Sequence, residues 1–274
     1  MRSASDARDH DVSADDRSAE TRTPPDPRSQ LHCLRAAEID VVRRWFAPGR
    51  RVLELGGGDG FQGYLLSQLG CTVSSIDIDP RPNEAGGIYP VLAYDGRRIP
   101  FPDDTFDAVF SSNVLEHVVD LPRVLSELRR VCRRQGFGVH LVPSAAWRFW
   151  TVVTHYPWLA QRVLRATMPR SAQQPTISGS KRRNTPAQLV FKILGLAPHG
   201  EHTSALTELY YFRRARWCAI LAENGFETTY QGDNSLFYTG HLLAPGLSIK
   251  TRRRLARALG AACHVFVVRR RDSL

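Results

Sequence analysis

Cysteine is scarce in this chain and is never closely paired. The five cysteines are widely scattered and form no CxxC pair, so the sequence predicts neither a disulfide framework nor a cysteine-rich zinc site. Long apolar runs are missing as well. No run of about 18 uncharged apolar residues occurs, and the first residues contain no apolar core of a signal peptide. We therefore expect a cytoplasmic protein without a membrane span.

Large apolar residues are almost absent from residues 1–30. This segment is rich in Asp, Arg, Ser, Thr and Pro, so it cannot offset the entropy cost of ordering, and we predict a disordered tail. Residues 31–274 exceed the usual size of one domain but fit a single α/β domain that carries an insertion at 144–214. With 42% hydrophobic residues, the chain can bury a sizeable core.

Excess positive charge is absent from the first half of the chain. The net charge is −2 over residues 1–30 and −1 over residues 31–142, whereas residues 143–274 carry nineteen basic and six acidic residues, a net of +13. Such asymmetry favours an anionic partner, although solubility alone would also explain it.

The stretch Arg51–Gly60 organises the rest of the chain. It reads RVLELGGGDG, which predicts a buried strand that runs into a glycine loop. The following segment, Phe61–Gly70, has apolar residues at helical spacing and ends in glycine. A strand, a glycine loop and a helix N-terminus together present free N–H groups to an anionic or polar ligand.

Two kinds of ligand compete for this loop. Gly58, Gly60 and Gly63 satisfy the GxGxxG dinucleotide fingerprint, and Asp77 lies close to the position where a carboxylate binds ribose hydroxyls. This match alone does not choose between a dinucleotide and another nucleoside ligand.

The same stretch also reads Glu54-x-Gly56-x-Gly58-x-Gly60. It resembles the first motif of class I S-adenosylmethionine-dependent methyltransferases, in which the acid faces the methionyl ammonium. An acid at Glu54 suits a cationic amino acid and would repel a pyrophosphate. A charged residue near a strand end can also be merely solvated or paired, so Glu54 alone favours a methyltransferase only modestly.

A second block of residues makes the resemblance specific. Asp95-Gly96, then Ile-Pro-Phe at 99–101, a strand from Asp107 and the series Asn113-x-Leu-Glu-His117 are similar to the methyltransferase branch that includes ubiquinone and menaquinone biosynthesis enzymes. No dehydrogenase fingerprint explains this block. The resemblance covers residues 31–143 well and fades after Pro143.

The resemblance implies S-adenosyl-L-methionine as the cofactor. It implies that Asp77 takes both ribose hydroxyls, that Asp95 accepts from the adenine amino group, and that residues around Asn113 line the methionyl end. Taken alone, Asp95 is equally well explained as a turn former before Gly96. The full predicted cofactor set is Glu54, Gly56, Gly58, Gly60, Asp77, Ile78, Asp95, Gly96 and Asn113.

The resemblance also implies the fold. We predict an α/β, Rossmann-like class I methyltransferase fold with a seven-stranded, mostly parallel sheet, an antiparallel last strand and a helical insertion between strands five and six. Residues 121–134 predict a helix that ends in solvated arginines before Gly136, followed by a strand at 137–142 with His140 in a structural role. Later elements are expected as helices at 188–196, 215–224 and 250–259 and as strands at 226–231 and 263–269.

The insertion is unusually aromatic and basic. Residues 145–168 contain three tryptophans with interleaved arginines, and Pro157 should break them into two short helices. They suit a lid over a substrate or a surface that rests on lipid headgroups, and an ordinary helical cover is an equal alternative. The segment 169–186 reads as a mobile basic loop.

Three histidines are candidate general bases, namely His117, His199 and His202, because imidazole accepts a proton near neutral pH. His117 could instead cap its own turn. The cluster at 198–202 offers too few ligands for a metal, so no metal site is predicted.

The predicted function is methyl transfer to a small-molecule or lipid- or glycan-linked acceptor, anionic in character, with peripheral contact to a membrane. An RNA methyltransferase and a catalytically silent cofactor-binding scaffold are the alternatives. No RNA-binding module accompanies the arginines, which argues against nucleic acid.

Overall fold

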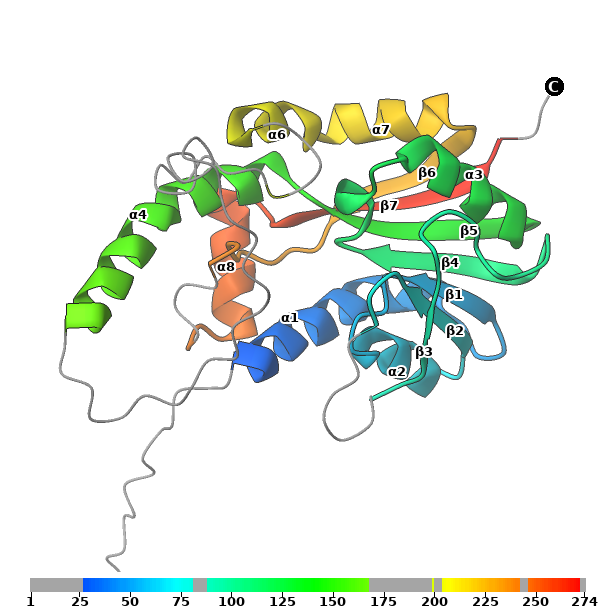
Figure 1. The fold of residues 1–274 in the computed structure, drawn as a ribbon, viewed down its shortest axis with the longest axis horizontal. Helices are drawn as coiled ribbons and strands as arrows, with labels where there is room; N and C mark the ends of the chain where they lie inside the picture. Colours follow the sequence, from blue (N-terminus) through cyan, green and yellow to red (C-terminus); the bar gives the residue numbers. More distant parts are fainter. Residues whose placement is uncertain (1–26, 81–87, 168–198, 200–203, 242–245, 272–274) are drawn as a thin grey trace, which may run out of the picture.

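The fold is a twisted seven-stranded sheet covered by helices on both faces (Figure 1). The computed structural model describes residues 27–80, 88–167, 199, 204–241 and 246–271. The strands are β1 Arg51–Leu55, β2 Thr72–Asp77, β3 Val91–Ala93, β4 Phe106–Ser112, β5 Cys132–Pro143, β6 Phe226–Asp233 and β7 Cys263–Arg270. The helices are α1 Pro27–Val42, α2 Phe61–Gln68, α3 Leu121–Val131, α4 Ala145–Thr167, α6 Ala205–Tyr211, α7 Arg214–Glu223 and α8 Ile249–Leu259, with short 3-10 turns η1 Arg43–Trp45 and η2 Leu115–His117.

The sheet order is β3-β2-β1-β4-β5-β7-β6. Strands β1 to β5 are parallel to one another, and β7 pairs antiparallel with both β5 and β6. The predicted seven-stranded, mostly parallel sheet with an inserted antiparallel last strand is confirmed. The chain builds β2 and β3 on one side of β1 and then returns to build β4 on the other, which places a switch point between β1 and β4.

Each face of the sheet has its own apolar core. On one face, Val52 of β1 packs with Leu34 of α1 and Leu66 of α2. On the other, Leu53 packs with α3 and α7. Figure 1 shows the same division, with α1 and α2 below the sheet and α3 and α7 above it. Burial on both faces explains why the β1 sequence is apolar without alternation.

Three boundary predictions are wrong, and one helix was not predicted. Helix α1 begins at Pro27, so residues 27–30 belong to this helix rather than to a tail, and Gln30 is buried. Helix α3 ends at Val131, and β5 begins at Cys132 rather than at residue 137, because a register shift in the β4–β5 pairing absorbs the extra residues before Gly136. Helix α6 was not predicted.

The predicted break of the insertion helix at Pro157 is also wrong, because α4 continues through it. Proline removes one N–H bond, to the carbonyl four residues earlier at Val153. That residue is 42% exposed, so water can replace the lost donor.

Several predicted features lie outside the described residues: the tail at 1–26, most of the connection between β2 and β3, the loop at 169–186, the helix at 188–196, and His202. Among the helices that the structure does describe, none combines the length and the apolar character needed to cross a membrane.

Candidate active site

The predicted cofactor residues lie at the carboxyl ends of four neighbouring strands. Asp95 follows β3, Asp77 ends β2, Glu54 and the glycine loop end β1, and Asn113 follows β4. These strands are adjacent in the order β3-β2-β1-β4, so the fold brings together residues that are up to 59 positions apart in sequence. These carboxyl ends lie at the switch point, where ligands bind in open α/β sheets.

The loop after β1 requires its glycines. Gly56, Gly58 and Gly60 have φ values of +81°, +55° and +83°. A Cβ on Gly56 would also lie 2.2 Å from Cγ2 of Val114. The N–H groups of Gly56 and Gly57 both donate to the Ile76 carbonyl of β2, which fixes the loop against the neighbouring strand.

Glu54 lies beneath this loop as a buried carboxylate. Its exposed fraction is 1%, and its Oε2 accepts from Ser75 Oγ at 2.6 Å. Burial raises the pKa of Glu54 to about 7, and the nearby charges of Asp59 and Asp77 contribute to the shift. Among the described residues, no lysine, arginine or histidine forms an ion pair with Glu54. A cationic group bound in the loop would supply the missing counter-charge.

Asp77 holds the glycine loop in place. Its Oδ2 accepts from Gly58 N at 2.8 Å and its Oδ1 from Asp79 N at 2.9 Å. Each carboxylate oxygen keeps a second lone pair that can accept from a ribose hydroxyl. The sequence did not reveal this loop-fixing role, because the separation of 19 residues gives no local signal.

Asp95 forms a turn. Its Oδ1 accepts from the N–H groups of Arg97 and Arg98 at 2.8 and 2.9 Å, and these bonds lower the pKa of Asp95. The turn-forming alternative is thus what the hydrogen bonds show, and the adenine role stays a prediction. Gly96 lies against Ile78, which is 69% exposed. Ile78 therefore offers an apolar surface between the two acids.

Asn113 has an unusual backbone conformation, with φ of +55°. Its N–H donates to the Leu141 carbonyl, and its Oδ1 accepts from Cys263 Sγ at 3.3 Å. A left-handed non-glycine residue costs about 1 kcal/mol and is retained where surrounding contacts enforce it, often at functional sites.

A buried carboxylate that the sequence did not reveal lies beside Asn113. Glu38 of α1 has 0% exposure. Its oxygens accept from Arg35 Nη1 at 2.7 Å, Tyr238 OH at 2.6 Å, Asn234 Nδ2 at 3.1 Å and Ser112 Oγ at 3.3 Å. This network fastens α1 to the end of β4 and to the segment after β6.

Two of the three candidate bases meet above β4. The rings of His117 and His199 lie 4.8 Å apart, and His199 also packs on Trp147 at 4.6 Å. Loss of hydration lowers the pKa of His199 to about 4, with smaller contributions from His117 and Arg148. His199 is therefore a weak proton acceptor at pH 7, and His117, whose side chain is 43% exposed, is the better-placed base of the pair.

His140 lies in β5 as predicted and is buried, with its Nδ1 2.8 Å from Ser111 Oγ. Burial lowers its pKa to about 4, so it stays neutral.

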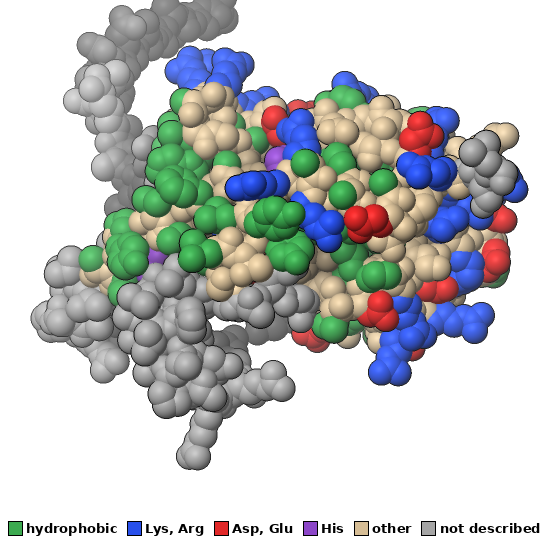
Figure 2. All heavy atoms as spheres, turned by 90° about the horizontal axis from the view of Figure 1, so that it is seen from above, with side chains coloured by type: hydrophobic (Ala, Val, Ile, Leu, Met, Phe, Trp, Pro, Cys, Tyr) green, Lys and Arg blue, Asp and Glu red, His purple; other side chains and the backbone are tan. Residues whose placement is uncertain are grey.

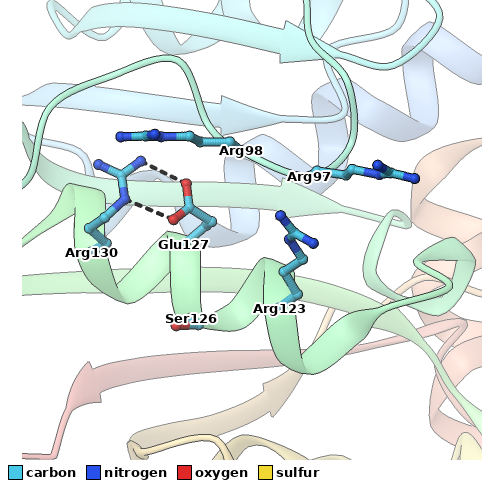
Figure 3. A pocket seen from close by; sticks show the side chains of 6 residues that line it. All are labelled: Arg97, Arg98, Arg123, Ser126, Glu127 and Arg130. Carbon is cyan, nitrogen blue, oxygen red and sulfur yellow. Dashed lines mark hydrogen bonds and ion pairs between the residues drawn. The ribbon is translucent and has the colours of Figure 1, made fainter.

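A basic pocket of about 380 Å³ adjoins the Asp95 turn (Figure 3). Arg97 and Arg98 reach it from the turn, and Arg123 and Arg130 from α3. Arg130 pairs bidentately with Glu127 and donates to the carbonyls of residues 99 and 101. The expectation that the arginines ending α3 are merely solvated is wrong for Arg130, which ties this helix to the 97–104 loop.

Comparison with known proteins agrees with this geometry. Residues 53–139 match the family model described as methyltransferase domain. An uncharacterized methyltransferase of Mycobacterium sp. (strain KMS) is 38% identical over 95 residues, which cover 33% of this chain and 38% of the relative. A demethylmenaquinone methyltransferase of Mycolicibacterium paratuberculosis is 36% identical over 91 residues, covering 32% and 40%. The chain thus spans about two fifths of the length of these curated relatives.

Solved structures extend the likeness to the fold of nearly the whole chain. An S-adenosylmethionine-dependent methyltransferase from Mesorhizobium loti has a TM-score of 0.52 at 17% identity, covering 85% of this chain and 98% of the other. A putative one from Listeria monocytogenes has a TM-score of 0.51 at 12% identity, covering 88% and 99%. At such identities the likeness concerns the fold alone. Residues 53–139 are therefore similar to a methyltransferase domain, and the chain as a whole has the fold of the class I methyltransferases.

Proposed function

We propose that the protein transfers a methyl group from S-adenosyl-L-methionine to an acceptor that enters above β4. The observation that carries this proposal is Glu54, a buried carboxylate beneath the glycine loop for which the described residues supply no counter-ion. It lies at the same carboxyl end of the strands as Asp77 and Asp95. A nicotinamide dinucleotide would place a pyrophosphate against this loop, where Glu54 would repel it. The ammonium group of an amino acid would instead neutralise the negative charge of Glu54.

Each of these residues would bind a different part of the cofactor. Glu54 would hold the cofactor's ammonium, Asp77 its ribose hydroxyls, and Asp95 with Ile78 its base. When bound, the cofactor supplies a methyl group on an already activated sulfonium. The chain then needs mainly to align the acceptor and exclude water, and His117 can remove a proton from a hydroxyl or carbon acid.

The proposed acceptor is anionic and small, or linked to a lipid or glycan. The net charge of +13 over residues 143–274 supports this proposal, because that half supplies α4 and His199 above β4. One relative is a demethylmenaquinone methyltransferase, which is consistent with an amphipathic acceptor.

The Asp77→Ala variant tests the cofactor assignment. It should weaken binding of S-adenosylhomocysteine by about 1.5–3 kcal/mol, because it removes charge-assisted hydrogen bonds and frees the loop at Gly58. Isothermal titration calorimetry measures this loss. Asp79→Asn, a change at an exposed neighbouring acid, is the matched control and should bind normally. Tight binding of a nicotinamide dinucleotide, with no binding of the methionine-derived ligand, would refute the proposal.

The proposed membrane contact needs different residues from those the sequence suggested. Trp147 is 6% exposed, and the Trp150 Nε1 donates to the Leu259 carbonyl, so neither is placed to enter a bilayer. Up to residue 160, where its side chains are described, α4 instead exposes the large apolar residues Phe149, Val153 and Tyr156, at 49%, 42% and 53% exposure. Figure 2 shows hydrophobic side chains gathered towards the end of the molecule where α4 lies.

Vesicle flotation tests this contact. We expect the protein to bind vesicles that contain phosphatidylglycerol and not vesicles of pure phosphatidylcholine. The bound fraction should fall as salt screens the basic residues. The salt-resistant part should be lost in a variant with serine at 149, 153 and 156, since these side chains supply the apolar contribution. Leu31→Ser, a change at an exposed apolar residue of α1, should leave it unchanged. Failure to float at low salt would exclude the membrane contact and leave a soluble acceptor.

A further inference from the structure

Three carboxylates and two guanidinium groups lie close together above β4. Arg35 Nη1 pairs with Glu38 Oε2 at 2.7 Å, and Arg148 Nε pairs with Glu208 Oε2 at 2.7 Å. Both glutamates of these pairs have side chains with 0% exposure. The third carboxylate, Glu116 of η2, also has a side chain with 0% exposure, but it has no guanidinium of its own.

Glu116 is the unsatisfied member of this group. Neither of its oxygens has a hydrogen-bond partner from another described residue. The largest effects of charge on it come from one guanidinium, Arg35, and from two carboxylates, Glu38 and Glu208. Together, the two ion pairs and Glu116 contain three carboxylates and two guanidiniums, so one carboxylate is in excess. A buried carboxylate in this position must either take up a proton or bind a cation.

Two imidazoles lie next to Glu116. The His117 Nε2 is 3.8 Å from Glu116 Oε1, and the His117 and His199 rings are 4.8 Å apart. One potential ligand atom from each of Glu116, His117 and His199 can be chosen so that all three lie within 4.8 Å of one another. In a tetrahedral site with bonds of about 2.0–2.1 Å, ligand atoms are roughly 3.4 Å apart, so small side-chain rotations would close the gap.

His199 is held in position independently of any metal. The backbone N–H of His199 donates to Glu208 Oε1 at 2.6 Å, and the imidazole ring packs on Trp147. Glu208 is in turn fixed by Arg148 of α4. The ion pair between α4 and α6 thus places the third ligand opposite η2.

We propose that Glu116, His117 and His199 bind a divalent transition-metal ion. One carboxylate oxygen and two imidazole nitrogens are a ligand set typical of zinc and of neighbouring first-row metals. Each histidine keeps an exposed part whereas Glu116 is buried, so the remaining coordination positions lie on the solvent side of the three residues. If the proposed methyl transfer holds, such a position would bind an acceptor oxygen and lower the pKa of its proton, and His117 would then act as a metal ligand in place of a general base.

Zinc titration of the full chain tests the proposal. The protein is freed of metal with a chelator and titrated with Zn²⁺ in competition with a chromophoric chelator. We expect one site whose affinity falls at least tenfold in Glu116→Gln and in His199→Gln. A Co²⁺-substituted sample should show the visible absorption of low-symmetry coordination, and both variants should lose it. His241→Gln removes a histidine that stacks on Trp158, away from the triad, and should bind Zn²⁺ normally.

Glu116→Gln preserves volume and removes a buried charge, so it should fold, and thermal melting checks this. If it does not fold, His199→Gln decides. The proposal is overturned if the native protein binds no Zn²⁺, or if both variants bind it as tightly as the native protein does. Binding of S-adenosylhomocysteine by the metal-free protein is measured in parallel. Failure of the metal site alone would leave that binding intact, whereas failure of the proposed function would abolish it and leave Zn²⁺ binding unchanged.

Discussion

Replacing Glu54 by Gln is expected to weaken binding of S-adenosylhomocysteine roughly 100-fold at pH 7.5. The side chain is buried, and no cationic group of the described part of the chain pairs with it, so a bound ammonium is the natural counter-charge. Removing one member of a buried charge pair costs about 3 kcal/mol or more, because the other charge is left desolvated. Calorimetry with the native protein and the variant measures the difference.

The affinity for S-adenosylhomocysteine should also depend on pH, and the ionisation of Glu54 determines the direction of this dependence. In the cofactor-free protein, burial raises the pKa of Glu54 to about 7, and a bound ammonium would lower it. Binding then requires loss of a proton below pH 7, so affinity should rise with pH. We expect an affinity about 20-fold lower at pH 5.5 than at pH 7.5, and this dependence should vanish in Glu54→Gln.

The same substitution should stabilise the empty protein. The folded-state pKa of Glu54 lies above its ordinary value of 4.5, so the carboxylate is easier to ionise in the unfolded chain, and stability is lost as the pH rises towards 7. Glu54→Gln should raise the free energy of unfolding by up to about 3 kcal/mol at pH 8, measured by urea denaturation. Glu227→Gln, at an exposed acid of β6, is the control. Unchanged affinity in Glu54→Gln would contradict the assigned role.

Local signals in the sequence were sufficient for the first half of the fold. The β1 strand, the glycine loop and α2 follow from apolar runs and from glycines whose positive φ values the structure bears out. The order of β6 and β7 had no such signal. It came from the family resemblance, because periodicity describes a strand and not its neighbours.

Burial of charged residues was the main feature that the sequence left hidden. Glu38 lies four residues after Leu34 and four before Val42, which places it on the apolar face of α1, and this spacing could have been noticed. Besides Arg35 of the same helix, its partners are contributed by β4 and by residues 234 and 238, nearly 200 positions away. No pattern within α1 could identify these distant partners.

The histidine cluster shows the same limit. The residues 198–202 alone gave too few ligands to predict a metal, and η2 alone gave a turn. The fold brings Glu116 and His117 against His199, and only then do three ligand-bearing side chains converge. Pro157 is the opposite case, where a strong local signal predicts a break and the helix nevertheless continues through the proline.

A second large effect, this time on the free energy of unfolding, is expected at the Arg148–Glu208 ion pair. Its side chains are 4% and 0% exposed, and their atoms are 2.7 Å apart. Glu208→Gln should lower the free energy of unfolding by about 3–5 kcal/mol, because it removes the carboxylate charge that lies 2.7 Å from the buried Arg148 Nε. Glu208 also accepts from the backbone N–H of His199. We therefore expect backbone hydrogen exchange to accelerate in α4 and α6, while cofactor binding at the β1 loop persists.

A double variant separates a lost ion pair from lost packing. Replacing Arg148 by Met and Glu208 by Leu removes both charges while keeping apolar volume, so it should recover most of the stability that Glu208→Gln loses. The exposed pair Arg216–Glu223, with atoms 3.4 Å apart, is the matched control, and Glu223→Gln should change the free energy of unfolding by less than about 0.5 kcal/mol. Equal effects of Glu208→Gln and Glu223→Gln would show that the buried pair does not hold α6 against α4, and that His199 is positioned by other contacts.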